Sequence, residues 1–108
     1  MRLFTRRKKQ ATGAPAESTS QRRAEVTAHF KEFATTREGV EAYIEPPTAN
    51  DPTTMVLVAR TGEWTRRRVP DEKAARGLAR DLSIPVYDVN LTGYPSSMRR
   101  WSAAQRRK

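Results

Sequence analysis

Apolar positions along the first half of the chain change from a helical to a strand period near Gly39. Val26, Phe30 and Phe33 recur at i, i+4 and i+7, which places them on one face of a helix over about residues 20–37. From residue 40 to residue 45 apolar and polar side chains alternate, with Tyr43 on the polar side, which predicts a half-buried strand.

The middle of the chain predicts a β-hairpin. Three prolines between residues 46 and 52 end the first strand, because proline cannot donate a hydrogen bond to a β-ladder. Residues 55–59 are almost uninterrupted apolar residues, as is typical of a central strand. Thr61-Gly62 then forms a tight turn, and residues 64–69 form the returning strand.

The last third predicts a helix, a strand and a second, shorter helix. Pro70-Asp71-Glu72 suits a helix start, and alanine and leucine build a narrow apolar face up to Leu82. Residues 84–91 predict a fourth strand, which Gly93 and Pro95 end. A serine at 96 or 97 would cap a short helix that runs into a basic tail.

These elements predict an α+β fold with the order α-β-β-β-α-β. A right-handed crossover would place the fourth strand parallel to the first, giving a mixed four-stranded sheet with the order 4-1-2-3. Both helices would pack on one face as a two-layer sandwich and leave the other face partly open. A chain of 108 residues supports one domain. We therefore expect a disordered basic arm over 1–19, a domain over 20–95 and a basic C-terminal helix or tail over 96–108.

The net charge of +9 is concentrated at the two ends of the chain. Residues 1–10 and residues 99–108 each contain five basic residues and no acid. Residues 11–98 hold the other eleven basic residues against all twelve acids, a net charge of −1. Blocks of like charge commonly act as contacts for polyanions, although they also increase solubility. The charge distribution thus favours binding of nucleic acid by the two ends.

Two tryptophans lie among arginines and extend the candidate nucleic-acid site. In the predicted strand over 64–69, Trp64, Arg66 and Arg68 share one face, where an indole and guanidinium groups can contact bases and phosphates. In the alternative interpretation these arginines pair with glutamates at 41, 45 and 63 while Trp64 belongs to the core. The candidate residues are Arg2, Arg6, Arg7, Lys8, Lys9, Trp64, Arg66, Arg68, Arg99, Arg100, Trp101, Arg106, Arg107 and Lys108.

The sequence contains no pattern of an enzyme or of a cofactor site. The absence of cysteine excludes disulfides, thiolate metal sites and cysteine nucleophiles. Neither a phosphate-binding glycine loop nor a G-x-S-x-G turn is present. His29, the single histidine, has Glu25 and Glu32 at helical spacing, which is a weak pattern for a metal ion. We therefore predict no enzymatic activity, no cofactor and no metal.

Several segments together resemble a group of small basic proteins that is widespread in actinobacteria. The resemblance covers about residues 25–100 and is carried by Gly39–Pro46, Gly62–Val69, Ile84–Val89, Gly93-Tyr94-Pro95 and Met98-Arg99. It implies a bacterial cytoplasmic protein and no particular activity. No apolar run is long enough to cross a bilayer or to act as a signal peptide, so we expect no integral membrane association.

The sequence thus predicts a nucleic-acid-binding accessory protein that favours RNA over DNA and associates with the ribosome through its basic ends. A protein-interaction module that docks through the open sheet face or the Trp101 helix is the alternative. A weaker third hypothesis is attachment to anionic lipid through Met1–Phe4 and the basic run that follows.

Overall fold

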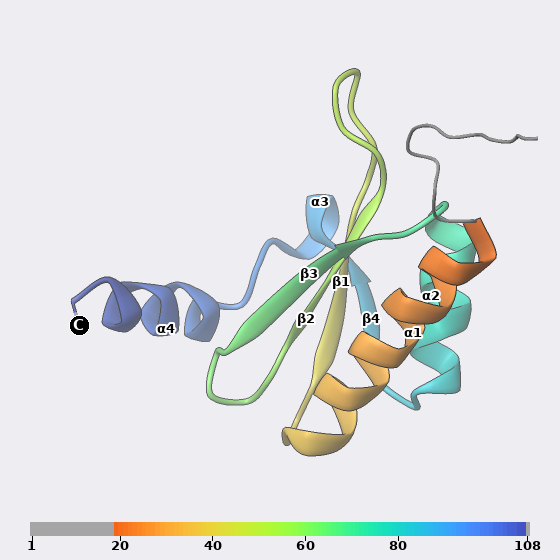
Figure 1. Ribbon diagram of the computed structural model, residues 1–108. Helices are drawn as coiled ribbons and strands as arrows, with labels where there is room; N and C mark the ends of the chain where they lie inside the picture. The colour runs from red at the N-terminus through yellow and green to blue at the C-terminus, as the bar shows by residue number, and fades with distance from the viewer. Residues whose placement is uncertain (1–18, 108) are drawn as a thin grey trace, which may run out of the picture.

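A computed structural model of the chain describes residues 19–107 (Figure 1). The elements follow the order α-β-β-β-α-β-α-α. They are α1 (Thr19–Thr36), β1 (Glu41–Glu45), β2 (Thr54–Val58), β3 (Trp64–Arg68), α2 (Glu72–Asp81), β4 (Val86–Asp88), α3 (Val89–Thr92) and α4 (Ser96–Arg106). None of the helices in this part of the chain is long and apolar enough to span a membrane.

The four strands form one mixed sheet with the order β3-β2-β1-β4. β2 pairs antiparallel with both β1 and β3, and β4 pairs parallel with β1. The predicted α+β class and the predicted order 4-1-2-3 are therefore confirmed. In the register, Tyr43 lies opposite Val56 on one side and Tyr87 on the other, and Val56 lies opposite Arg66. These four side chains consequently share one face of the sheet.

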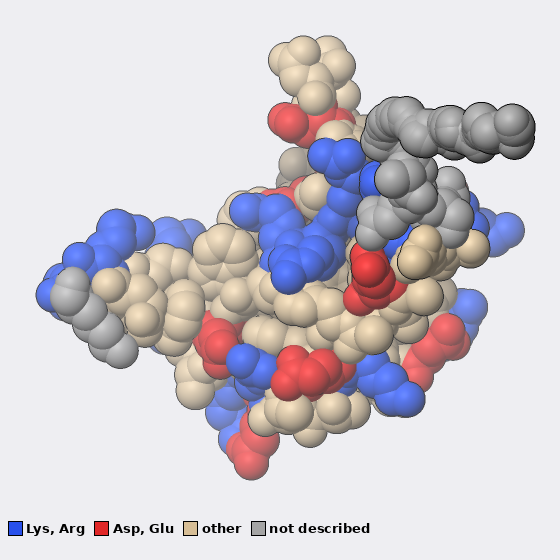
Figure 2. Space-filling view, viewed as in Figure 1, with Lys and Arg blue, Asp and Glu red and all other residues tan. Residues whose placement is uncertain are grey.

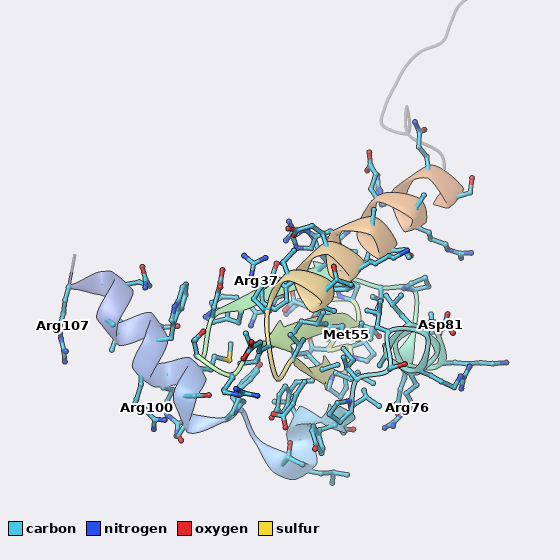
Figure 3. The ribbon with its side chains drawn as sticks, turned by 90° about the horizontal axis from the view of Figure 1, so that it is seen from below. Arg37, Met55, Arg76, Asp81, Arg100 and Arg107 are labelled. Carbon is cyan, nitrogen blue, oxygen red and sulfur yellow. The ribbon has the colours of Figure 1, made fainter. Side chains whose placement is uncertain are left out.

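The other face packs against α1 and α2 and forms the main core (Figures 1 and 3). α1 contributes Phe30 and Phe33, two residues of its predicted apolar stripe, and both are buried. α2 contributes Ala75 and Ala79, whose small side chains allow the helix to lie close to the strands. The Asp71 carboxylate caps the start of α2 by accepting a hydrogen bond from the Ala74 amide at 2.8 Å.

The second face of the sheet is less open than the sequence suggested. Tyr43, Val56 and Val58 on this face form a second apolar cluster with Met98 of α4. Val56 is completely buried although neither α1 nor α2 covers it. The chain that follows β4 returns across this face and places the start of α4 beside the turn between β2 and β3 (Figure 1). The sheet is therefore covered in part on both sides.

The region after α2 departs most from the sequence prediction. The strand expected over 84–91 is only three residues long, because the Asp88 carboxylate accepts a hydrogen bond from the Asn90 amide at 2.8 Å and starts α3. The expected serine cap of the last helix is wrong, since Pro95 occupies the cap position without a side-chain hydrogen bond. The last helix, α4, continues through the basic segment as far as Arg106.

Candidate nucleic-acid interface

α4 projects from the sheet and carries most of the basic residues at the C-terminal end (Figure 1). No acidic residue follows Asp88 in the sequence. Within the described residues, the side chains of Arg99, Arg106 and Arg107 have no hydrogen-bond or ion-pair partner, whereas the Arg100 side chain donates to the Ser96 hydroxyl at 3.1 Å. All four arginines are exposed, and Figure 3 shows Arg107 at the far end of the helix. This helix is thus a cationic arm with no counter-charge of its own.

The arginines of α4 lie on the side of the helix that faces away from the sheet. Arg99 and Arg106 are seven residues apart, as are Arg100 and Arg107, so each pair returns to nearly the same side of a helix. The two members of each pair are about 10 Å apart along the helix axis. Met98 is buried on the opposite side. The guanidinium groups therefore form two rows on adjacent sides of the helix, about 100° apart around its axis.

The first turns of α4 are attached to the β2–β3 turn by three contacts. The Trp64 indole donates its Nε1 hydrogen to the Ser102 hydroxyl at 2.9 Å. Met98 packs in the second apolar cluster with Val58. Gly62 lies so close to the backbone of Ser97 that a Cβ at position 62 would be 2.1 Å from the Ser97 carbonyl oxygen. This attachment fixes the direction in which α4 leaves the body.

Arg66 and Trp64 serve the fold rather than a free binding surface. Arg66 donates to both oxygens of the Glu45 carboxylate, at 2.8 and 2.9 Å, and its guanidinium lies 5.1 Å from the centre of the Trp64 ring. The Tyr94 hydroxyl also donates to Glu45. Burial alone would raise the pKa of Glu45, but the hydrogen bonds from Arg66, Thr54 and Tyr94 outweigh burial and lower that pKa. For Arg66 and Trp64, the alternative interpretation, in which both residues stabilise the fold, describes the structure better than nucleic-acid binding does.

The remaining parts of that interpretation are not found. Glu41 accepts a hydrogen bond from the Tyr43 hydroxyl at 2.9 Å, and no β3 arginine reaches it within the described residues. Glu63 pairs instead with Arg37 at the end of α1, where the closest nitrogen-to-oxygen distance is 2.8 Å. The arginines of β3 therefore use one glutamate of the three.

Arg68 remains available at the edge of the sheet. It is exposed and has no partner within the described residues, and β3 is an edge strand. Its neighbour Arg67 points to the opposite side of the strand and donates to the backbone oxygen of Arg66 at 2.7 Å. Figure 2 shows lysine and arginine side chains gathered over the sheet, with uncharged side chains between them and α4. Arg68 is therefore a second exposed cation on the sheet edge, separate from the arginines of α4.

His29 has a structural role on α1. Its Nε2 atom lies 2.7 Å from the Thr65 hydroxyl of β3, which links the helix to the edge strand. Burial and the neighbouring Arg67 lower the pKa of His29, so the neutral ring is favoured. Among residues 19–107 no group of three or more histidine, aspartate or glutamate side chains could hold a metal ion.

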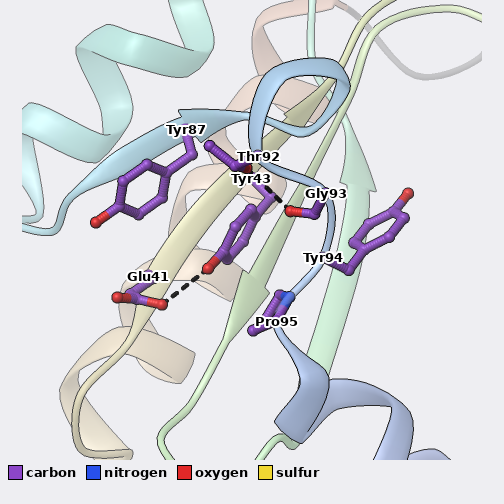
Figure 4. Close-up of a pocket in the computed structure, with 7 residues that line it drawn as sticks. All are labelled: Glu41, Tyr43, Tyr87, Thr92, Gly93, Tyr94 and Pro95. Carbon is purple, nitrogen blue, oxygen red and sulfur yellow. Dashed lines mark hydrogen bonds between the residues drawn. The ribbon is translucent and has the colours of Figure 1, made fainter.

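A shallow pocket of about 160 Å³ opens on the second face of the sheet (Figure 4). Sequence reasoning did not find it, because its residues come from β1, β4 and the segment after α3 and share no local pattern. The lining residues are Glu41, Tyr43, Tyr87, Thr92, Gly93, Tyr94 and Pro95.

The predicted site residues of the N-terminal arm lie outside the described part of the chain, as does the last residue. These are Arg2, Arg6, Arg7, Lys8, Lys9 and Lys108. The structure places the arginines of α4 on one projecting helix, whereas Arg68 lies at the other end of β3 from the turn to which α4 is attached. Trp101, which is half-buried, lies in the same helix.

Comparisons of the chain with protein-family models, with curated proteins and with solved structures found no match. The resemblance to small actinobacterial proteins stays a prediction.

Proposed function

We propose that the protein binds RNA through α4 and the adjoining edge of β3. The observation that carries this proposal is the array of four exposed arginines on a projecting helix that has no acid and no ion pair among the described residues. Like charges on one short helix repel each other, and a phosphate backbone relieves this repulsion while releasing its counterions.

The dimensions of α4 suit contact with a nucleic-acid backbone. Its eleven residues span about 16 Å, with Arg99 and Arg100 near its middle and Arg106 and Arg107 at its C-terminal end. Arg68, exposed at the other end of β3, supplies a separate phosphate contact in this proposal. The basic residues at 2–9 supply a second set of phosphate contacts in this proposal. We propose RNA rather than DNA because folded RNA presents unpaired bases in its loops and bulges, on which arginine and Trp101 can stack. Cytoplasmic ribosomal RNA is the partner that we propose.

The competing hypothesis of protein docking on the open sheet face has less surface than the sequence suggested. Val56, Val58 and Tyr43 are buried in the second cluster, so they offer no exposed apolar patch. The lipid hypothesis depends on Met1–Phe4, which lie outside the described residues. RNA binding through α4 is therefore the function that the described geometry supports best.

The proposal is tested by measuring RNA affinity across a salt series by fluorescence anisotropy. The test variant replaces the four arginines of α4 with glutamine: Arg99→Gln, Arg100→Gln, Arg106→Gln and Arg107→Gln. If each arginine contacts a phosphate, the slope of log affinity against log salt should become shallower by about 3 units. The affinity at low salt should fall in parallel.

A matched control removes the same charge from exposed positions of α1 and α2: Arg23→Gln, Lys31→Gln, Lys73→Gln and Arg80→Gln. Both variants have the same net charge, so a general charge effect would lower their affinities equally. Equal losses in the two variants would contradict the proposed site. An unchanged slope in the α4 variant would contradict the proposed function.

A further inference from the structure

We propose that the pocket beside Tyr43 binds a guanidinium group, presented as an arginine side chain by a partner peptide. The pocket has a volume of about 160 Å³ and is lined by three tyrosines and one carboxylate (Figure 4). None of its lining residues belongs to the arginine array of α4. The pocket is therefore distinct from the proposed RNA-binding site.

The pocket contains a negative charge that the described chain leaves uncompensated. Glu41 accepts one hydrogen bond, from the Tyr43 hydroxyl at 2.9 Å, and makes no ion pair among residues 19–107. A carboxylate has two oxygens and about four acceptor positions, so most of the acceptor capacity of Glu41 is unused. In a chain with a net charge of +9, this pocket is a local site for a cation.

The aromatic rings of the pocket suit a flat cation. Tyr43 and Tyr87 pack with their ring centres 5.4 Å apart and their planes inclined by 32°. Tyr43 itself is only 6 % exposed, so the ring that a ligand can reach is that of the half-buried Tyr87. The face of an aromatic ring is electron-rich, and arginine both stacks on such a face and bonds a carboxylate with two parallel hydrogen bonds. Burial and the Glu41 hydrogen bond raise the pKa of Tyr43, so its hydroxyl stays protonated and continues to donate.

The same sheet face already contains a guanidinium bound by groups of these kinds. Glu45, four residues along β1 from Glu41, receives two hydrogen bonds from Arg66 and one from the Tyr94 hydroxyl. The Trp64 ring lies 5.1 Å from the same guanidinium. At the other end of β1, Glu41 has a tyrosine hydroxyl and aromatic rings beside it and no arginine from the described chain. An external arginine would complete this second arrangement.

Other ligand classes fit the pocket less well. The phosphate of a nucleotide would be repelled by Glu41, which carries the only charge among the lining residues. A lysine ammonium is a compact point charge, which cannot lie flat on a ring and bond both carboxylate oxygens at once. The guanidinium group matches both the charge and the flat wall of the pocket.

The test is an NMR titration of the full ¹⁵N-labelled chain with N-acetyl-arginine amide. We expect saturable shifts at the amides of Gly93 and Tyr94, with a dissociation constant in the millimolar range that one ion pair and one ring contact provide. N-acetyl-citrulline amide has nearly the same shape without the charge, and it should bind at least about tenfold more weakly. A peptide Ala-Ala-Arg-Ala-Ala should bind more tightly than the single amino acid if the natural ligand is a peptide side chain.

Two variants test whether the Glu41 carboxylate is the group that binds arginine. Glu41→Gln keeps an acceptor for the Tyr43 hydroxyl but removes the charge, and it should weaken arginine binding at least about tenfold. Asp81→Asn makes the same chemical change on α2, where the side chain has no partner within the described residues, and it should leave binding unchanged.

Three results would overturn the proposal. They are equal binding of arginine and citrulline, unchanged binding by Glu41→Gln, and tighter binding of guanosine monophosphate than of the arginine probe. If N-acetyl-arginine amide binds as tightly as the peptide, the inference that the natural ligand is a peptide side chain is wrong. Because no RNA is present, the result does not depend on whether α4 binds nucleic acid.

Discussion

Replacing Gly62 with alanine should detach the root of α4 from the sheet. A Cβ at this position would lie 2.1 Å from the carbonyl oxygen of Ser97 and 2.9 Å from the Cβ of Trp101. The clashing atoms belong to the helix backbone or lie next to it, so no side-chain rotation can relieve the contact. The start of α4 must therefore move away from the β2–β3 turn.

The magnitude follows from what this movement breaks. Exposing Met98, now 8 % exposed, costs about 1.5–3 kcal/mol. Losing the hydrogen bond from Trp64 to Ser102 costs about 0.5–1.5 kcal/mol. Gly62 also has φ = +98°, where a residue with a Cβ is strained by about 1–3 kcal/mol. We expect the free energy of unfolding to fall by the sum of these costs.

Gly93→Ala separates the strain from the clash. Gly93 has φ = +71°, and a Cβ at this position would meet nothing within 4 Å. Gly93→Ala should therefore show only the strain, and Gly62→Ala should be less stable than Gly93→Ala by about 2–4 kcal/mol. Urea unfolding followed by circular dichroism measures both values.

Tryptophan fluorescence reports the detachment itself. In a Trp101→Phe background the emission comes from Trp64 alone, and Gly62→Ala should shift that emission to longer wavelength in the absence of urea. The reasoning is refuted if Gly62→Ala and Gly93→Ala are equally stable and the emission of Trp64 is the same in both.

Three further predictions concern the core and the pH dependence of stability. Phe30→Ala should lower the free energy of unfolding in urea by about 3–5 kcal/mol, because the ring is fully buried under α1. Because its pKa is lowered in the folded state, the Glu45 carboxylate stabilises the fold above its ordinary pKa of 4.5, and this stability is lost as the pH falls through the folded value. Glu45→Gln should therefore remove part of the acid-induced loss of stability measured between about pH 5 and pH 2. The pKa of His29 is lowered from 6.5, so folding is weakened as the pH falls through 6.5, and thermal melts of His29→Gln should show less of this decrease.

The architecture could be predicted from the sequence because its determinants are local. The period of Val26, Phe30 and Phe33 indicates α1, and the turn at Thr61-Gly62 sets the register of the hairpin between β2 and β3. The parallel placement of β4 then follows from the general handedness of crossovers. Each step needs only neighbouring residues or a rule that applies to most folds.

The contacts made after β4 could not be predicted in this way. The Asp88 cap ends the fourth strand early through a single side-chain hydrogen bond. The contact between Gly62 and Ser97 joins residues 35 positions apart, and no periodicity in the sequence records it. The Tyr43 pocket is likewise assembled from separate elements. The arginines of α4 could be identified as candidates from the sequence. The structure was needed to show that Arg66, unlike them, is paired with a glutamate.

The position of β3 at the edge of the sheet has a consequence for self-association. The outer backbone groups of an edge strand can pair with a second copy of the chain and begin aggregation. This strand carries two arginines without an ion pair among the described residues, Arg67 and Arg68. A second β3 laid alongside would therefore bring four such guanidinium groups onto the two faces of the extended sheet, in addition to the paired Arg66 of each copy. The repulsion acts at the unpaired outer edge of β3, and it opposes growth of the sheet beyond four strands.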